Sequence, residues 1–300
     1  MSRRVAVTGA SGFIGRHVMT ALAGRGDRAV AIRRSFDEGA LVDTFKSADV
    51  VLHMAGVISA VHERELVAGN VESTRVVARA ARDAGARLVY ISSLAAAGPA
   101  PASAPRSEDD PPAPITPYGR TKLAAERVIG GLAGLRWTIL RPAVVYGPGD
   151  RAVRPLYVWA RLGVLPIAGH PSAAYTFIYV DDVIRAIAAA IDREPDGDTI
   201  FLGHARPVAT RELAEEIRST LGSPVRLIPI PEAIVRTVSA AGDLAGRVTG
   251  KPATLNRNRL AELYAPGFVC CVDRMRDRLG IVAETDLREG LRKAAAWYKS

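Results

Sequence analysis

The hydrophobic residues of the chain follow two spacings that take turns along its length. Short runs rich in Val, Ile, Leu and Ala are typical of buried strands, and stretches with apolar residues three and four apart are typical of amphipathic helices. The runs predict strands over 4–8, 28–33, 49–54, 87–92, 136–141, 176–179 and 199–202. The helical spacing predicts helices over 13–24, 61–84, 117–132 and 181–192. Because strands and helices alternate, the pattern favours parallel βαβ units and an α/β fold.

The pattern changes in two places. Residues 98–117 are rich in Pro, Ala and Ser with a short acidic run, which predicts a loop long enough to be a lid or a rim. After about residue 205, helical segments are separated by proline-containing connectors. We therefore expect a sheet domain over 1–150, to which 176–205 returns, and a smaller, mostly helical substrate lobe made of 151–175 and 206–300.

Composition narrows the classes of protein. The 300 residues are 48% hydrophobic, enough to bury a full core. No run approaches the ~18 consecutive apolar residues of a membrane span, and a strand begins so early that no signal peptide fits. We therefore expect a cytoplasmic protein without membrane insertion. Cys270 and Cys271 are adjacent and the five histidines are scattered, so we expect no metal site.

The chain is basic, with a formal net charge of +9. The charge comes mostly from arginines that are spread along the sequence without a basic block. This distribution argues against nucleic acid as a partner. It favours a surface that attracts phosphorylated small molecules.

Three glycines, Gly9, Gly12 and Gly15, lie between the first predicted strand and the first predicted helix. Glycine permits a tight turn and lets a pyrophosphate approach the free N–H groups at a helix N-terminus. Glycines also simply end strands, but the position directly after the first strand favours dinucleotide binding.

The second predicted strand ends in two arginines, Arg33 and Arg34, with no acidic residue before Asp37. An acidic residue here would bind the ribose 2′-hydroxyl of NAD, whereas arginine accommodates the 2′-phosphate of NADP. The pair therefore favours NADP, although in an arginine-rich chain two more arginines can lack a function, so NAD stays an alternative.

The segment "TPYGRTKLAAERVI" carries the strongest chemical signal. Tyr118 and Lys122 are four residues apart, so on a helix they share a face. A lysine ammonium beside a tyrosine, together with the positive nicotinamide ring, would lower the pKa of the phenol from about 10. Upstream, Ser92 and Ser93 end a predicted strand, where their hydroxyls either face a ligand or cap the next segment of the chain.

In this order the motifs resemble the extended short-chain dehydrogenase/reductase family, which includes nucleotide-sugar epimerases and dehydratases, dihydroflavonol-type reductases and 3β-hydroxysteroid dehydrogenases. The resemblance covers about the first 205 residues. It rests on "TGASGFIG", "VVLHMAG", Asn70, "VYISS", "YGRTK", "RPAVVYGPGD" and "FIYVDDVIRAI". It implies a doubly wound Rossmann sheet that binds NAD(P) and a small-molecule substrate, and it leaves a homodimer open.

The resemblance also implies roles for individual residues. Tyr118 would be the general acid–base, Lys122 its pKa modulator and a ribose ligand, and Ser93 the hydroxyl that hydrogen-bonds the reacting oxygen. Ser93 is preferred over Ser92 because it lies five residues before Gly98, as the family's catalytic hydroxyl does before its glycine.

A cofactor site is implied in the same way. His53, Ala55 and Gly56 would line the nicotinamide-side ribose largely through backbone, Asn70 would support a proton relay or brace its helix, and Pro142 would lie by the carboxamide. The full expected set is Gly9, Ser11, Gly12, Phe13, Ile14, Gly15, Arg33, Arg34, His53, Ala55, Gly56, Asn70, Tyr118, Lys122 and Pro142.

The sequence departs from the family pattern in three places. Between Arg34 and Val50 the chain is short and lacks a strand end with an adenine-contacting Asp. The usual "VYG" reads "AAG" at 96–98. Val144 stands where nucleotide-sugar enzymes commonly carry an Asn that contacts the diphosphate.

These observations favour an NADP-linked oxidoreductase acting on a secondary alcohol or its ketone or aldehyde. One alternative is a nucleotide-sugar epimerase or dehydratase that keeps its NAD, with Arg151, Arg154 and Arg161 as candidate phosphate ligands. Another is a cofactor-sensing or assembly protein without catalysis, which the intact set of Ser93, Tyr118 and Lys122 argues against.

Overall fold

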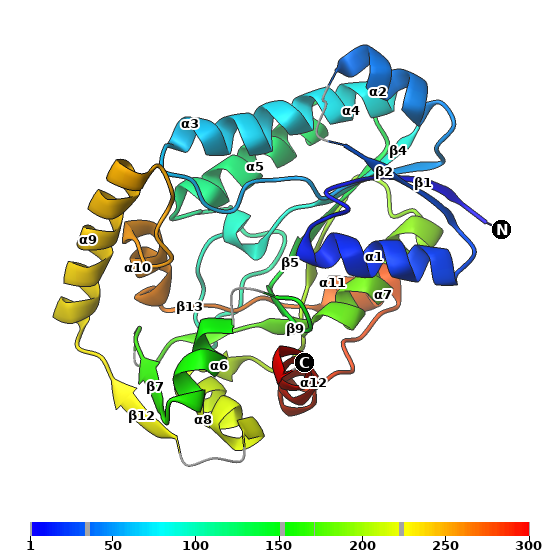
Figure 1. Ribbon diagram of the computed structural model, residues 1–300. Coiled ribbons are helices and arrows are strands. Elements are labelled where there is room, and N and C mark those ends of the chain that lie inside the picture. Colours follow the sequence, from blue (N-terminus) through cyan, green and yellow to red (C-terminus); the bar gives the residue numbers. More distant parts are fainter. Residues whose placement is uncertain (1, 34–36, 151–153, 171, 222–224, 300) are drawn as a thin grey trace.

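The computed structural model describes residues 2–33, 37–150, 154–170, 172–221 and 225–299. Its centre is a six-stranded parallel sheet in the order β10-β5-β4-β3-β1-β2 (Figure 1). The strands are β1 (Arg4–Thr8), β2 (Arg28–Ile32), β3 (Val50–His53), β4 (Arg87–Ile91), β5 (Trp137–Pro142) and β10 (Asp198–Leu202). The predicted doubly wound α/β fold is confirmed, and each of these strands lies within a residue of its predicted bounds.

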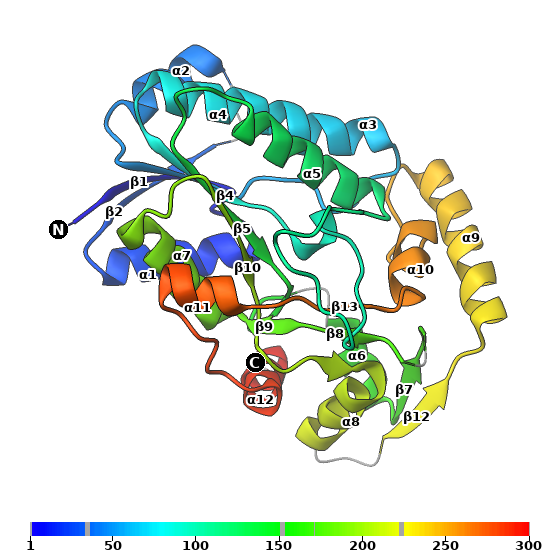
Figure 2. The same cartoon turned by 180° about the vertical axis from the view of Figure 1, so that it is seen from behind.

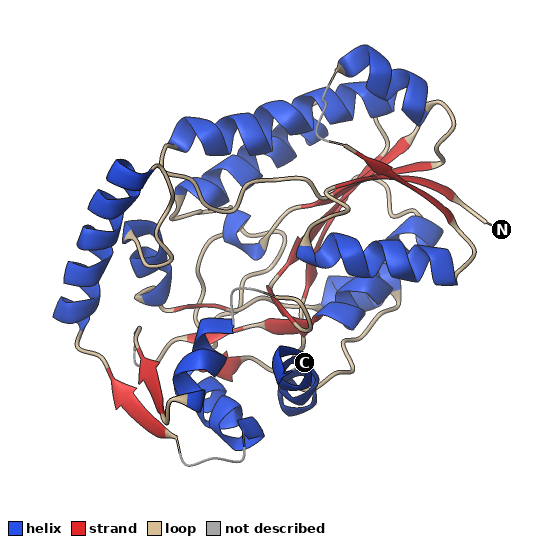
Figure 3. Cartoon of the chain, viewed as in Figure 1, coloured by secondary structure: helices blue, strands red, loops and turns tan. Residues whose placement is uncertain are grey.

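Helices cover both faces of the sheet, because most of its strands are apolar on both sides (Figure 3). One face packs against α1 (Phe13–Gly24), α7 (Val180–Arg193) and α11 (Asp273–Leu279). The other packs against α2 (Glu38–Phe45), α4 (Ser73–Asp83) and α5 (Pro117–Gly130). The predicted helix over 61–84 is α3 (Glu63–Leu66), a π-helical turn η1 (Val67–Glu72) and α4 in succession.

The strand order creates a crevice at the carboxyl ends of β1 and β3. The chain passes from β1 outward to β2 and then returns to β3 on the other side of β1. This reversal is the place where open α/β sheets bind ligands. The short connection noted in the sequence contains α2 and no strand over 37–49, so β2 is the outer strand of the sheet.

The remaining elements lie beyond the carboxyl ends of the strands (Figure 2). They are β6 (Val144–Tyr146), α6 (Arg154–Arg161), β7 (Val164–Ile167), β8 (Ala174–Tyr175), β9 (Phe177–Tyr179), β11 (Val208–Ala209), α8 (Thr210–Leu221), β12 (Arg226–Pro229), α9 (Glu232–Thr249), α10 (Arg257–Leu263), β13 (Gly267–Phe268) and α12 (Leu287–Lys299). The predicted division into two domains stays a prediction. Within the described residues, no helix is both long and apolar enough to cross a bilayer.

The proline-rich loop after β4 is fastened to the fold. It comes after the short helix η2 (Leu94–Ala96), and its backbone pairs with the chain around β13 at Ala100–Phe268 and Arg106–Cys270. The Glu108 carboxylate accepts a hydrogen bond of 2.9 Å from the N–H of Phe201 in β10. These contacts hold the loop along the rim of the molecule.

Candidate active site

The turn between β1 and α1 requires glycine at two of its positions. Gly9 has φ +74°, and a Cβ there would lie 2.7 Å from the backbone nitrogen of Ala55. A Cβ at Gly15 would lie 2.2 Å from the carbonyl oxygen of Gly9. Gly12 is the N-cap residue of α1, and no side chain caps the helix. A close backbone and an uncapped helix N-terminus fit a pyrophosphate group, so the residues present suit a dinucleotide.

His53, at the end of β3, is fully buried beneath this turn. Its Nδ1 lies 2.6 Å from Thr8 Oγ1, and its Nε2 lies 2.9 Å from Thr74 Oγ1. The Thr8 hydroxyl already accepts hydrogen bonds from the N–H groups of Met54 and Ala55, so it donates to Nδ1. His53 is therefore the neutral tautomer with its proton on Nε2.

The electrostatics agree with this assignment. Burial, and to a lesser extent the charge of Lys122, lowers the pKa of His53 to about 3. His53 is absent from the lining of the pocket beside Tyr118. It supports residues 54–55 through Thr8 instead of reaching a substrate.

Asn70 lies on η1 and is 1% exposed. Its Oδ1 accepts a hydrogen bond of 2.7 Å from the N–H of Val57, and its Nδ2 donates to the Val57 carbonyl at 2.9 Å. The same Nδ2 donates to Thr121 Oγ1 at 3.0 Å. Asn70 thus braces the loop after β3 against α5, whereas the proton relay stays a prediction.

Tyr118 and Lys122 lie on one face of α5, whose start is set by the predicted cap. The Thr116 hydroxyl accepts a hydrogen bond from the N–H of Gly119, and Pro117 occupies the first turn. Lys122 Nζ donates to the Ile91 carbonyl at 2.7 Å and lies 4.3 Å from the centre of the Tyr90 ring. The ammonium is therefore held beneath the end of β4.

The Tyr118 hydroxyl is hydrogen-bonded to Ser93, which lies just beyond the end of β4. Desolvation raises the pKa of Tyr118 to about 12, and the bond with Ser93 opposes this rise. Burial also lowers the pKa of Lys122 to about 7, opposed by Glu126. The sequence predicted that Lys122 lowers the phenol pKa; among the described groups of the protein, burial raises it and Ser93, instead of Lys122, opposes the rise. At neutral pH Tyr118 holds its proton and can donate it.

A buried ionic cluster supports this face of α5, and sequence reasoning missed it. Glu126, one turn after Lys122, receives hydrogen bonds from Arg141 Nε at 2.9 Å and from Arg141 Nη2 at 2.5 Å. The Ser92 hydroxyl also donates to Glu126. Ser92 therefore faces inward, and its neighbour Ser93 faces the pocket, as alternation along an extended backbone requires.

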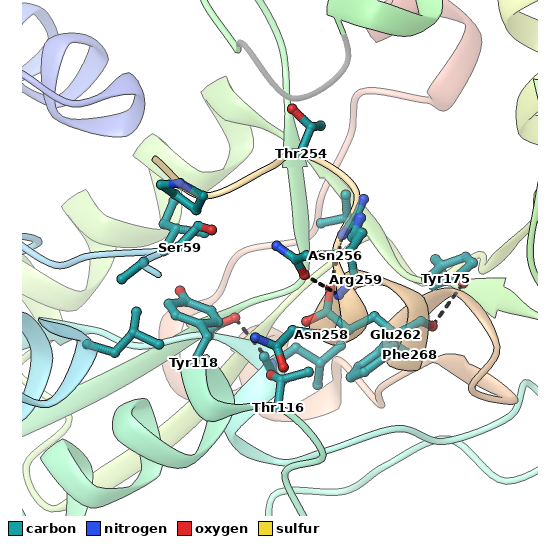
Figure 4. A pocket seen from close by; sticks show the side chains of 18 of the residues that line it. Ser59, Thr116, Tyr118, Tyr175, Thr254, Asn256, Asn258, Arg259, Glu262 and Phe268 are labelled. Carbon is teal, nitrogen blue, oxygen red and sulfur yellow. Dashed lines mark hydrogen bonds and ion pairs between the residues drawn. The ribbon is translucent and has the colours of Figure 1, made fainter. Parts of the chain in front are cut away.

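A pocket of about 550 Å³ opens beside Tyr118 (Figure 4). Ser93 and Tyr118 lie in its wall together with Pro142 and Val144. The described wall comes from several separate parts of the chain and is mostly apolar. Its described residues are Ile58, Ser59, Ala60, Leu66, Ser93, Leu94, Ala95, Thr116, Tyr118, Pro142, Ala143, Val144, Tyr175, Pro252, Ala253, Thr254, Asn256, Asn258, Arg259, Glu262 and Phe268.

Polar side chains of α10 form one side of this pocket, and the sequence did not single them out. Asn256 caps α10 by accepting from the N–H of Arg259 at 2.9 Å. Arg259 Nη1 lies 3.1 Å from Glu262 Oε2. Figure 4 shows Asn256, Asn258, Arg259 and Glu262 grouped at the same pocket as Tyr118. The one local signal in the sequence was Asn256 itself, because Asn is a common residue at the N-cap of a helix.

The other predicted residues lie outside the pocket wall. Arg33 is exposed at the end of β2, while Arg34 and Arg151 lie outside the described residues. Ser11 is exposed in the glycine turn, and Phe13 and Ile14 are half-buried in the first turn of α1. The structure does not describe the side chain of Arg154. Arg161 is exposed on α6 and does not line the pocket.

Comparisons with known proteins point the same way. The chain is 29% identical over 318 residues to ceramide reductase of Caulobacter vibrioides, covering 99% of this chain and 94% of that protein. It is 28% identical to 2-alkyl-3-oxoalkanoate reductase of Stenotrophomonas maltophilia, with 98% of each chain covered.

Among solved structures, MoeE5 in complex with UDP-glucuronic acid and NAD superimposes with a TM-score of 0.80 at 27% identity, covering 99% of both chains. The NAD dependent epimerase/dehydratase family matches residues 5–203, which hold the glycine turn, the sheet and α5. The chain therefore belongs to the NAD dependent epimerase/dehydratase family and is an NAD(P)-dependent enzyme of the extended short-chain dehydrogenase/reductase type.

Proposed function

We propose that this enzyme is an NADP-dependent oxidoreductase that interconverts a secondary alcohol and a ketone or aldehyde. The observation that carries the proposal is the pocket, where Ser93 and Tyr118 lie in a mostly apolar wall. Its described lining has one pair of charged side chains, Arg259 and Glu262, which neutralise each other. Such a wall suits an apolar substrate with few polar groups.

The Ser93, Tyr118 and Lys122 side chains would perform the acid–base step. NADPH, when bound, supplies the hydride that reduces the carbonyl carbon. Ser93 donates a hydrogen bond to the carbonyl oxygen, and Tyr118 gives this oxygen its phenolic proton. Lys122 carries part of its charge near its pKa of about 7, and this charge stabilises the phenolate that remains. In the oxidative direction the same proton returns to Tyr118.

The cofactor would lie along the carboxyl ends of β1 and β3. The turn at Gly9, Gly12 and Gly15 would hold the pyrophosphate, and Lys122 would bind ribose hydroxyls. Arg33 is exposed at the end of β2, where a guanidinium would accommodate the 2′-phosphate of NADP. NAD is the alternative cofactor. It lacks the 2′-phosphate, so its binding would not depend on Arg33.

Two relatives narrow the substrate class. Ceramide reductase and 2-alkyl-3-oxoalkanoate reductase are both named as reductases of molecules with alkyl chains. We therefore favour reduction of a ketone that carries such a chain, with the chain against the apolar wall. Asn256 and Asn258 of α10 would then face the polar part of the substrate.

NADPH absorbance measures the reaction directly. Supplied with a panel of alkyl ketones and aldehydes, the enzyme should consume NADPH, and Tyr118→Phe should retain NADPH binding without this turnover. UDP should leave the melting temperature unchanged, since binding to the folded state would raise it. A panel without net cofactor consumption, together with a stabilising effect of UDP, would overturn the proposal.

The second candidate is a nucleotide-sugar epimerase or dehydratase that retains NAD. It is favoured by the likeness to MoeE5, whose structure holds UDP-glucuronic acid and NAD. One feature of the pocket opposes it: Val144 offers no hydrogen bond to a diphosphate. Protein purified with bound NAD and active on a UDP-sugar would establish this candidate instead.

A further inference from the structure

Helix α9 presents an unusual stretch of exposed apolar surface. Ile234, Val238, Leu244 and Val248 are 53%, 49%, 64% and 81% exposed. Their spacing places them on one side of the helix. The helix stands at the periphery of the molecule beside α10 in both opposite views (Figures 1 and 2). Large apolar side chains gathered on one helix face mark a surface that meets something less polar than water.

The inner side of α9 is built differently, for packing against the pocket wall. Val235, Ser239 and Gly246 are buried. A Cβ at Gly242 would lie 2.3 Å from the carbonyl oxygen of Leu255, so glycine lets the pocket-lining segment approach the helix closely. The helix is therefore fixed in place by one side, and its apolar side is left outward.

The exposed face leads to the mouth of the pocket. Pro252 and Thr254, just after α9, line the pocket together with Ile58 and with Leu66 of α3. Figures 1 and 2 both show the C-terminal end of α9 next to α3. Ile58 is itself 77% exposed. Apolar surface thus continues from α9 across the opening.

The charged residues around α9 indicate the sign of the charge on the partner. Both acidic residues of the helix are paired, Glu232 with Arg236 and Asp243 with Arg257. Arg247 and Lys251, at the end nearest the pocket, are exposed and have no ion pair among the described residues. The whole chain also carries a net charge of +9. An apolar stripe bordered by available cations suits an anionic lipid surface.

We propose that α9 and Ile58 dock this enzyme on an anionic lipid surface, with the pocket mouth turned toward it. The side chains of α9 enter the boundary between headgroups and acyl chains, while Arg247 and Lys251 contact lipid phosphates. The docking depends on the surface alone, whereas the delivery of an alkyl substrate from the lipid rests on the proposed function. The helix lies on the surface and does not span it.

Vesicle flotation without substrate tests the docking. The enzyme should float with vesicles of phosphatidylcholine mixed with phosphatidylglycerol and much less with phosphatidylcholine alone, and added salt should release it. Val248→Asp should lower the partition coefficient at least about tenfold, since a buried apolar contact is replaced by a charge facing anionic lipid. Val282→Asp is the matched control, because Val282 is 52% exposed elsewhere and should leave binding unchanged.

Three results would overturn the docking: no flotation with the mixed vesicles, equal losses in both variants, or a dimer in light scattering that only Val248→Asp dissociates. The last result would assign the face to a second copy of the chain. Turnover of a short soluble ketone should be the same in wild type and Val248→Asp. Flotation without any ketone turnover would refute the proposed function and leave the docking intact.

Discussion

His53 gives the enzyme a specific sensitivity to acid. Its pKa of about 3 means that the fold favours the neutral ring, so its stabilising contribution is complete above the unfolded value of 6.5 and is lost as the pH falls toward 3. For one group with these two values, the free energy of unfolding falls by about 2 kcal/mol between pH 8 and pH 5. That is a large part of the free energy of unfolding of a typical domain, which is roughly 5–15 kcal/mol.

The structure also explains what protonation breaks. A second proton would go to Nδ1, which already accepts the Thr8 hydroxyl hydrogen at 2.6 Å. Thr8 would have to turn, and it would then release the N–H groups of Met54 and Ala55 that lie against Gly9. Acid should therefore loosen the segment beside the glycine turn as well as lower overall stability.

Urea unfolding of wild type and His53→Gln between pH 8 and pH 5 measures this effect. Glutamine can accept from Thr8 and donate to Thr74, but it does not take up a proton in this range. The variant should be less stable at pH 8, and its deficit should shrink by about 2 kcal/mol at pH 5 as the wild type loses the contribution of neutral His53. A deficit that stays constant across this range would refute the reasoning.

Four further changes test the site. Tyr118→Phe should keep NADPH affinity and lower turnover by roughly 10²–10⁴-fold, the usual effect of removing a general acid–base; near-normal turnover would remove Tyr118 from the reaction. Glu126→Gln should move the limb of the pH–rate profile that belongs to Lys122 to lower pH, because Glu126 raises the pKa of Lys122; an unmoved limb would separate the two residues. Gly15→Ala should weaken NADPH binding more than about tenfold in a fluorescence titration, because the added Cβ would collide with the Gly9 carbonyl. Gly24→Ala on the same helix is the control and should bind NADPH normally, because a Cβ there meets nothing within 4 Å. Arg33→Ser should weaken NADPH binding about tenfold and leave NADH binding unchanged, since it removes a charge-assisted hydrogen bond to the 2′-phosphate. Arg28→Ser, at the other end of β2, is the control. Equal losses of affinity for both cofactors would contradict the NADP assignment.

The sheet and its helices could be predicted from the sequence because their signals are local. Strand β3 is buried on both faces and is therefore apolar up to its last residue, His53. The glycine turn and the Thr116–Pro117 cap depend on adjacent residues. The paired strands outside the sheet were harder. The two residues of β8 or β13 form a strand only because distant segments pair with them.

The polar side chains that surround the site were missed for a related reason. Glu126 and Arg141 have the pattern of exposed charges on a helix and a strand, and only the folded chain shows that they neutralise each other in the interior. Asn258 and Glu262 lie more than a hundred residues after Tyr118, and no local pattern connects them. The π-helical turn that carries Asn70 was also hidden, since its composition is that of an ordinary helix.

The position of β2 at the border of the sheet has a kinetic consequence. A dinucleotide places its adenosine half near the carboxyl end of this strand, and over residues 37–49 the chain adds a helix instead of another strand beyond it. Since no described strand lies beyond β2, we expect the adenosine half to gain less binding energy there and the residence time of the cofactor to be shorter. An epimerase, which reuses one nucleotide for every cycle, gains nothing from such an exit. A reductase must release oxidised cofactor after each turnover, so under the proposed function the position of β2 at the border of the sheet would favour faster turnover.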